Sequence, residues 1–178
     1  VFNVNKKFLI FNDIRKFGFI KIFNINKIFN SSHLKNLGVE PLDEKFNYEY
    51  FKSNHKRVID IKGLLMDQSF IAGLGNIYCS EILFDAKISP LRGSKTLKNI
   101  EIHNLIKSTK KILKDSIKYG GTTIKNFIVS DEKIGYFKNE LQVYSRNGLL
   151  CLRCKNQNFV IKIKQKGRST FLCKNCQI

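Results

Sequence analysis

Residues 65–78 read LMDQSFIAGLGNIY, and the glycines at 73 and 75 stand directly before an apolar segment of helical character. The pattern predicts a short helix over 59–67, a tight turn, and a second helix from Asn76 through Ala86. The first backbone N–H groups of a helix are unpaired and its dipole is positive there, so this turn suits an anion. An ordinary helix start capped by Asn76 is the alternative.

The segments on either side of this turn predict further helices and two β regions. Asp43 is a candidate N-cap for a helix over 44–54, and a long helix over 98–119 is expected to end at two glycines. Residues 1–30 carry closely spaced Phe, Ile and Val and predict two or three strands, which cannot form a stable sheet alone. From Leu141 onward the pattern is strand, turn, strand. We therefore expect an α+β fold with several domains.

Two C-x-x-C pairs, Cys151 with Cys154 and Cys173 with Cys176, are separated by 18 residues. This spacing is typical of one zinc ion held by four thiolates, with a hairpin between the pairs over 159–163 and 170–172. Four cysteine ligands leave no open coordination position, so the site is predicted to be structural rather than catalytic. Disulfides are the alternative, which a reducing cytoplasm disfavours. The fifth cysteine, Cys79, has apolar neighbours and is predicted to be a buried, inert thiol.

The chain carries 32 Lys and Arg residues against 14 Asp and Glu, a formal net charge of +18. Such an excess predicts a polyanionic partner such as nucleic acid. Lysine enrichment also follows from an AT-rich genome, so solvated surface charge is the alternative. Between the cysteine pairs, cations alternate along one predicted strand face that leads into a turn at Gly167, namely Lys162, Lys164, Lys166 and Arg168. Arginine is scarce, and its planar fork is expected to matter at Arg15, Arg57, Arg92, Arg146, Arg153 and Arg168.

Length and hydropathy exclude other classes of protein. A chain of 178 residues can bury a hydrophobic core without disulfides. No apolar run approaches the roughly 20 residues that a membrane-spanning helix requires. Lys6 and Lys7 interrupt the only early apolar stretch, which is unlike a signal peptide. These features predict a cytoplasmic protein with no membrane association.

Residues 65–78, followed by Ser80-Glu81 and by SPLR at 89–92, closely resemble the helix-two-turns-helix element of formamidopyrimidine-DNA glycosylases, bacterial enzymes of base-excision repair. Three further blocks occur in the family's order. The first, RKFG at 15–18, resembles the wedge loop. The second, GGTTIKNF at 120–127 with GYF at 135–137, resembles the lesion-covering loop. The third, LQVYSR at 141–146, leads into the zinc finger. The resemblance covers nearly the whole chain.

The resemblance implies the architecture and the activity. The parts implied are the end of an N-terminal β-sandwich (1–37), a helix-two-turns-helix domain (38–125), the lesion-covering loop and linker (126–140) and a zinc finger (141–178). The family's bifunctional glycosylases and AP lyases remove oxidised purines, 8-oxoguanine and formamidopyrimidines, from damaged double-stranded DNA. The implied cofactor is one structural Zn²⁺, with no nucleotide cofactor, in a monomer at the bacterial nucleoid.

The resemblance also implies roles for residues of the DNA interface. Asn76 and the turn amides would hold a phosphate beside the lesion, with Arg57, Lys62 and Tyr78 as neighbouring DNA contacts. For Arg57 and Lys62 the alternative is surface charge on short helices. Arg168 would grip the lesion phosphates and donate the proton in the last elimination, and generic phosphate binding is the alternative.

Further roles implied by the resemblance concern the flipped nucleotide. Phe17 would enter the base stack where the damaged nucleotide leaves it, and Arg15 would fill the gap and bond the orphaned base. Without the family, Phe17 would be interpreted as a strand core residue. The loop that closes over the extruded base would include Thr122, Thr123 and Tyr136, and an ordinary connector is the alternative.

One departure from the family bears on catalysis. The family's nucleophile is an N-terminal proline amine followed by glutamate, whereas the prolines here are Pro41 and Pro90. We therefore expect the chain as written to bind damaged DNA without excising a base, and to be the C-terminal part of an active enzyme. The alternative is a non-catalytic, zinc-dependent nucleic-acid-binding module.

Overall fold

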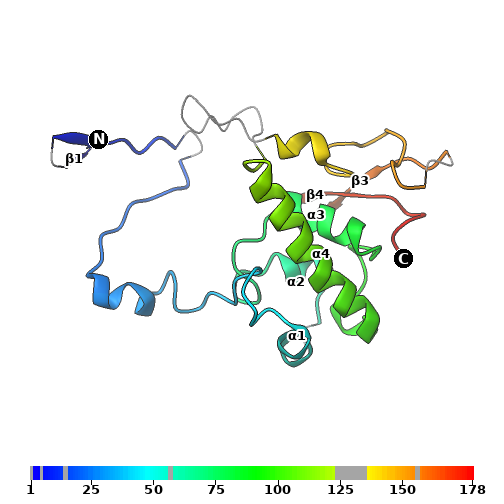
Figure 1. The fold of residues 1–178 in the computed structure, drawn as a ribbon, viewed down its shortest axis with the longest axis horizontal. Helices are drawn as coiled ribbons and strands as arrows, with labels where there is room; N and C mark the ends of the chain where they lie inside the picture. Colours follow the sequence, from blue (N-terminus) through cyan, green and yellow to red (C-terminus); the bar gives the residue numbers. More distant parts are fainter. Residues whose placement is uncertain (1, 5, 14–15, 56–57, 123–135, 155–156) are drawn as a thin grey trace. The chain divides into compact units, whose positions relative to one another are not determined.

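The computed structural model describes residues 2–4, 6–13, 16–55, 58–122, 136–154 and 157–178. The chain divides into two compact units, Val1–Lys35 and Asn36–Ile178. Figure 1 follows the elements in chain order, with the four α-helices and the second hairpin in the second unit. Within these described ranges, no helix is both long and apolar enough to cross a membrane.

The first unit holds one antiparallel hairpin, β1 (Phe2–Val4) with β2 (Lys7–Leu9). The sequence predicts strands as far as residue 30, but Ile25–Asn30 is the 3-10 helix η1. The reason is local, because the Asn24 side chain accepts the N–H two residues on and so caps a helical turn. Phe8 and other large apolar side chains of this unit are exposed, since strands of three residues bury little surface. The remnant of an N-terminal β-sandwich stays a prediction.

The second unit contains the predicted helices. α3 packs against α2 and α4, and α1 packs against α4 (Figure 1). The helices are α1 (Tyr48–Asn54), α2 (Ile61–Leu65), α3 (Asn76–Asp85) and α4 (Asn99–Lys118), with short 3-10 helices η2 (Ser94–Thr96) and η3 (Phe137–Glu140). The prediction of four helical segments is therefore confirmed.

Capping side chains shift the helix boundaries from those predicted. α1 begins at Tyr48 rather than Glu44, because the Asn47 side chain accepts the N–H three residues on. Asp43, the predicted cap, instead accepts a backbone N–H in the preceding turn. α2 is capped in the same way by Asp60, inside the predicted range. At the other end, α4 closes on Gly120 and Gly121, which both have positive φ, as predicted.

Two apolar clusters share helix α3. The larger cluster fills the space between the helices and includes Phe46, Phe51, Leu64, Leu65, Ile82, Leu83, Ile102 and Leu105, all fully buried. The smaller cluster consists of Phe84, Val143, Cys151, Val160, Phe171 and Cys173. Phe84 is the only α3 residue in this cluster, and the other members come from residues 141–178, which we call the cysteine subdomain. Helix α3 therefore belongs to the core on one side and to the cysteine subdomain on the other.

The cysteine subdomain contains an antiparallel hairpin, β3 (Ile161–Gln165) with β4 (Arg168–Leu172). The hairpin was predicted from the sequence. β3 lies two residues later than its predicted range, whereas β4 begins two residues earlier than predicted and ends at the predicted residue. Lys166 and Gly167 form the turn, both with positive φ. Figure 1 shows β4 beside α3, and the two elements are in contact. The hairpin is thereby placed against the helix that follows the glycine turn.

Candidate nucleic-acid interface and metal centre

The two C-x-x-C turns bring the sulfur atoms of Cys151, Cys154, Cys173 and Cys176 within 4.8 Å of one another. The Sγ–Sγ distances from Cys151 to Cys176 and from Cys154 to Cys173 are both 3.7 Å. Disulfide sulfurs lie about 2.05 Å apart, so the disulfide alternative is wrong. Tetrahedral coordination at about 2.3 Å per sulfur separates the ligands by about 3.8 Å. The cluster therefore has the dimensions of a tetrahedral metal site.

Ionisation of these thiols also favours a bound cation. Burial raises the pKa of the Cys151 thiol, but hydrogen bonds from the backbone N–H groups of Cys154 and Arg153 and with the Cys154 and Cys173 thiols together outweigh burial and lower the pKa to about 7. Burial, reinforced by the neighbouring thiols, raises the pKa of Cys176 to about 12. One sulfur therefore ionises readily while its neighbour resists, because adjacent thiolates repel one another. A divalent cation removes that repulsion, so the donor set fits a metal ion.

Cys79 lies apart from this cluster. Its side chain is fully buried in α3, and burial raises the pKa of its thiol to about 12. The prediction that Cys79 is buried is confirmed. A thiol with so high a pKa is almost wholly protonated near neutral pH and is a poor nucleophile.

The glycine turn places Asn76 where α3 begins. Gly75, rather than Asn76, is the N-cap, and the cap makes no side-chain hydrogen bond, so the interpretation of Asn76 as the cap is wrong. Gly73 has positive φ, and a Cβ built on either glycine meets nothing within 4 Å. The turn is therefore open on that side. The unpaired N–H groups of α3 and its dipole make this end of the helix favourable for an anion.

The Asn76 side chain is held from both sides. Its Oδ1 accepts a hydrogen bond from Lys62 Nζ at 2.6 Å, and its Nδ2 donates to the Ser169 backbone oxygen at 2.9 Å. Lys62 also donates to Thr170 Oγ1 at 2.6 Å. We call these four residues the α3 junction, since they join α2, the start of α3 and strand β4. One Nδ2 hydrogen of Asn76 is used on Ser169, which leaves the other for a ligand.

Lys62 is buried, with only 2% of its surface exposed, so the alternative of surface charge is wrong. Burial lowers the pKa of its ammonium to about 8, and the positive charge of Arg168 acts in the same direction. Cys79 and Asp60 act in the opposite direction. Contact between Lys62 and DNA stays a prediction, and its position beside Asn76 supports that prediction.

The lowered pKa of Lys62 predicts a pH-dependent affinity for DNA. A phosphate near the α3 junction favours the ammonium form, so binding is at full strength below about pH 8 and weakens as pH rises through the pKa of Lys62. The loss is expected to approach about tenfold per pH unit. Exposed lysines titrate near 10.4, so a titration between pH 7 and 9.5 isolates the effect. The measurement is the association constant for a DNA duplex as a function of pH, for the wild-type chain and for the Lys62→Met variant. The variant's association constant should not change over this pH range. Parallel pH profiles for the two proteins would contradict the assignment of the effect to Lys62.

The hairpin presents cations beside the α3 junction. Arg168 is exposed at the start of β4 and, with Asp60, Lys62, Gly63 and Met66 among other residues, lines a cleft of about 180 Å³. Lys162 and Lys164 are exposed on β3, as the predicted alternation requires. Lys166 differs from the prediction, because it lies in the turn and its Nζ pairs with Asp60 Oδ2 at 2.8 Å. Arg168 also differs, because it pairs with Gln165 across the hairpin and so lies on the opposite face from Lys162 and Lys164.

Other residues assigned from the resemblance have separate positions. The Tyr78 hydroxyl is 2.5 Å from Ser116 Oγ and 3.2 Å from Thr122 Oγ1, which links α3 and α4 to the start of the predicted loop. Tyr136 is exposed and pairs with Thr122 in an isolated β-bridge. Phe17 belongs to the first unit and is 80% exposed, so it is not a core residue. Arg15, Arg57, Thr123 and residues 124–135 of the predicted loop lie outside the described residues.

Sequence reasoning missed the role of Glu81. This glutamate is 2% exposed in α3 and accepts three backbone hydrogen bonds, from Gln142, Val143 and Tyr144, at 2.8 to 3.0 Å. Burial raises the pKa of its carboxyl despite these donors. The available signal was an acidic residue in the middle of a largely apolar helical segment, which suggests a buried acceptor but not its partners.

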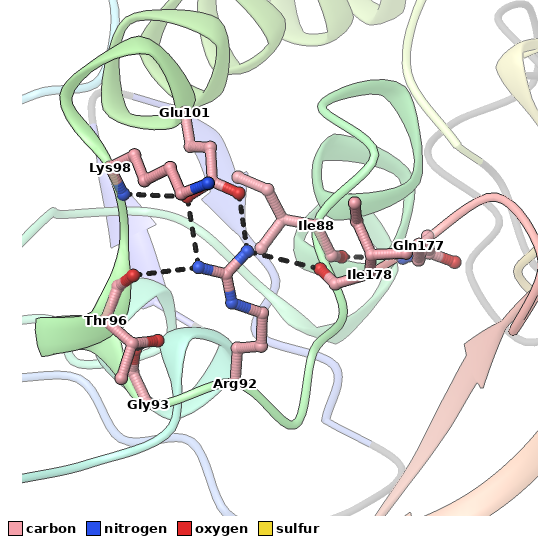
Figure 2. Close-up of polar contacts among 8 residues, drawn as sticks. All are labelled: Ile88, Arg92, Gly93, Thr96, Lys98, Glu101, Gln177 and Ile178. Atoms are coloured by element: carbon pink, nitrogen blue, oxygen red, sulfur yellow. Dashed lines mark hydrogen bonds and ion pairs between the residues drawn. The ribbon is translucent and has the colours of Figure 1, made fainter.

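Arg92 uses its planar guanidinium to make several hydrogen bonds at once, as we expected for the few arginines of this lysine-rich chain. Figure 2 shows its guanidinium between the Glu101 carboxylate and the carbonyl oxygens of Thr96 and Ile178. The pair with Glu101 is bidentate, at 2.5 and 3.0 Å, and lowers the pKa of that carboxyl. Arg92 thus connects the start of α4 with the segment that follows Cys176. Its role is structural.

Comparison with protein families matches residues 37–128 to the family described as formamidopyrimidine-DNA glycosylase H2TH domain. Curated proteins named formamidopyrimidine-DNA glycosylase from Rickettsia canadensis and Rickettsia bellii are 45% and 46% identical over 99% of the chain. The chain spans 64% of the length of each of these relatives.

Two solved structures have similar folds. The complex of Lactococcus lactis Fpg with DNA containing an abasic site has a TM-score of 0.85 at 37% identity, covering 93% of this chain and 60% of that one. The MutM (Fpg) protein of Thermus thermophilus has a TM-score of 0.76 at 35% identity, covering 81% of this chain and 55% of that one. The similarity to these folds extends beyond the residues matched by the family model.

Proposed function

This chain belongs to the formamidopyrimidine-DNA glycosylase family, and on that premise we propose that the α3 junction and the hairpin bind DNA at a damaged nucleotide. The observation that carries the proposal is the hydrogen bond between the Asn76 side chain and strand β4. The Asn76 amide, at the open N-terminus of α3, donates a 2.9 Å hydrogen bond to the Ser169 carbonyl, and the residue before Ser169 in the cysteine subdomain is the exposed Arg168. Asn76 and Arg168 both carry phosphate-binding groups, and together they would hold the backbone on either side of one nucleotide.

The partner we propose is damaged double-stranded DNA. The Lactococcus lactis relative is in complex with DNA containing an abasic site, which supports this choice. Removing a base from the stack costs a few kcal/mol, and the cost is lowest where the base is already lost. Phe17 would occupy the vacated space in the stack and Arg15 would bond the orphaned base. Arg57, Lys62 and Tyr78 would lie along the strand as further contacts.

The metal we propose is one Zn²⁺ held by Cys151, Cys154, Cys173 and Cys176. When bound, zinc would supply folding energy to the cysteine subdomain and no reactive position, because the four thiolates fill its coordination. The protein's own residues carry the interaction with DNA. The cluster of sulfurs and the geometry of the hairpin support this division of roles.

We propose for the whole protein the activity of a bifunctional DNA glycosylase and AP lyase acting on oxidised purines. The relatives are named for the formamidopyrimidine substrate, and this chain covers 64% of their length. Arg168 would bind the lesion phosphates and donate a proton in the last elimination, and Thr122, Thr123 and Tyr136 would belong to the loop over the extruded base. The domain boundaries expected from the sequence, a monomeric state and a nucleoid location are part of the same proposal.

The experiment that tests the proposed interface is the Arg168→Ala substitution. Removing one charged hydrogen-bonding group from a phosphate contact is expected to weaken binding to an abasic-site duplex about tenfold or more. The slope of log K against log salt should fall by the amount that one phosphate contact contributes. Lys107→Ala is the matched control, because Lys107 is an exposed cation on α4. Equal losses for the two variants would contradict a specific role for Arg168.

A further inference from the structure

Helix α3 contacts the cysteine subdomain at three points along its length. At its start, Asn76 Nδ2 donates to the Ser169 carbonyl. At its end, Arg153 Nη1 donates to the Phe84 carbonyl at 2.5 Å, and the guanidinium lies 4.0 Å from the centroid of the Phe84 ring. Between these two points, the Glu81 carboxylate accepts hydrogen bonds from the backbone N–H groups of residues 142–144. The subdomain is thus held in one register along α3.

The central contact differs in kind from the other two. Glu81 Oε2 accepts from the Gln142 N–H at 2.8 Å, and Oε1 accepts from the N–H groups of Val143 and Tyr144 at 3.0 and 2.8 Å. A carboxylate is an acceptor at both oxygens, so it can serve three consecutive amides. Glutamine has only one acceptor oxygen, and its NH₂ group would face a backbone donor. The site therefore requires a carboxylate.

The segment held by Glu81 leads directly into the core of the cysteine subdomain. Val143 is fully buried with Phe84, Val160 and Phe171, and the Tyr144 ring lies 4.9 Å from the Phe171 ring. Phe171 is in β4, the strand that begins at Arg168. Movement of residues 142–144 along α3 would therefore displace β4 and the cation at its start.

We propose that Glu81 is a positioning residue for DNA binding, because it fixes the cysteine subdomain on α3 and so sets the place of Arg168 relative to Asn76. The inference rests on the proposed function, in which those two residues share the DNA backbone. Glu81 itself is 2% exposed, and both of its carboxylate oxygens accept hydrogen bonds from the backbone of residues 142–144. Its effect on DNA is therefore indirect.

The test is the salt dependence of binding by the Glu81→Gln variant. The zinc-loaded chain and the variant are titrated with an abasic-site duplex at several salt concentrations, and zinc content is measured on the same samples. We expect one zinc per chain in both. The variant should bind about tenfold or more weakly, and the slope of log K against log salt should fall by about 0.9, the value for one lost phosphate contact.

The slope distinguishes positioning from general destabilisation. A variant that is merely less stable has a smaller active fraction, and its active molecules keep the wild-type slope. A zinc-loaded variant with an unchanged slope would therefore overturn the proposal. Glu81→Asp is the second variant, since it keeps the charge but shortens the side chain, and the same reduction in slope is expected. If neither variant folds, Glu81 is a stability residue and the positioning role is wrong.

Arg153→Ala provides a matched comparison at the end of α3. Arg153 is exposed, so its removal leaves no buried cavity, and a smaller change of slope in the same direction is expected. Failure of the inference differs from failure of the proposed function. If the wild-type chain binds the abasic-site duplex with no salt dependence, the proposed function fails. If the wild-type slope is steep and the Glu81 variants share it, only the positioning role fails.

Discussion

Removing the metal at neutral pH is expected to unfold the cysteine subdomain and to abolish binding to damaged DNA. The smaller apolar cluster has six buried members, and two of them are cysteines of the metal site. So little apolar surface cannot stabilise a subdomain alone, whereas structural zinc contributes roughly 10–16 kcal/mol to the folding of small zinc domains. Without metal, close thiolates repel and the hairpin loses its support. Arg168 and Ser169 would then leave α3.

Three measurements check this result on the same samples. Zinc analysis should give one ion per chain before chelation, and binding to an abasic-site duplex should disappear after it. Circular dichroism should retain most of its helical signal, because the α-helices precede residue 122 in the described chain. Cys173→Ala should reproduce the effect of the chelator.

Cys79→Ala is the matched control for the metal site. It removes a cysteine of equal size that is buried in α3 and lies outside the sulfur cluster. This variant should keep its zinc and its affinity for DNA. A Cys173→Ala variant that retains the hairpin and binds DNA without metal would contradict the structural role of the cluster.

The metal site and the helices could be predicted because their signals are local. Each C-x-x-C pair directs two sulfurs from a single turn, and only the meeting of the two turns depends on the fold. The apolar period of α4 and its glycine end are likewise contained within one segment. Helix starts were less accurate, because Asn47 and Asp60 compete with earlier residues as caps and the sequence does not rank them.

The α3 junction could be predicted only in part because its partners are distant in sequence. Asn76 was assigned from a pattern, but the bond from Lys62 to Thr170 crosses 108 residues. On a short helix, lysine is ordinarily exposed, and nothing near Lys62 in sequence indicates that it is buried. Glu81 escaped prediction for the same reason, since its acceptors are satisfied by amides 61 to 63 residues away.

The first unit shows a different limit of sequence patterns. Its apolar residues are dense enough to predict strands, but only β1 and β2 form among the described residues. Strand formation depends on pairing and burial rather than on propensity, and β1 and β2 pair only with each other. The Asn24 cap then favours a helical turn over 25–30. A strongly apolar pattern is therefore not sufficient to predict a sheet.

Binding of the zinc-loaded chain to an abasic-site duplex, beside the same duplex intact, tests the central claim most directly. The exposed cations Lys162, Lys164 and Arg168 and the open end of α3 are expected to contact several phosphates. A protein with 6–10 such contacts loses roughly 10³–10⁵ in affinity between 50 and 200 mM salt. The lesion lowers the cost of opening the stack by a few kcal/mol, so the damaged duplex should bind about tenfold or more tightly.

The two duplexes are compared at each salt concentration. We expect steep and nearly parallel salt slopes, because most phosphate contacts are common to both, with the preference for the damaged duplex maintained throughout. Equal affinity for the two duplexes would indicate a nucleic-acid-binding module that does not recognise damage. A flat salt response would contradict the account altogether, since the basic surface would then not contact DNA phosphates.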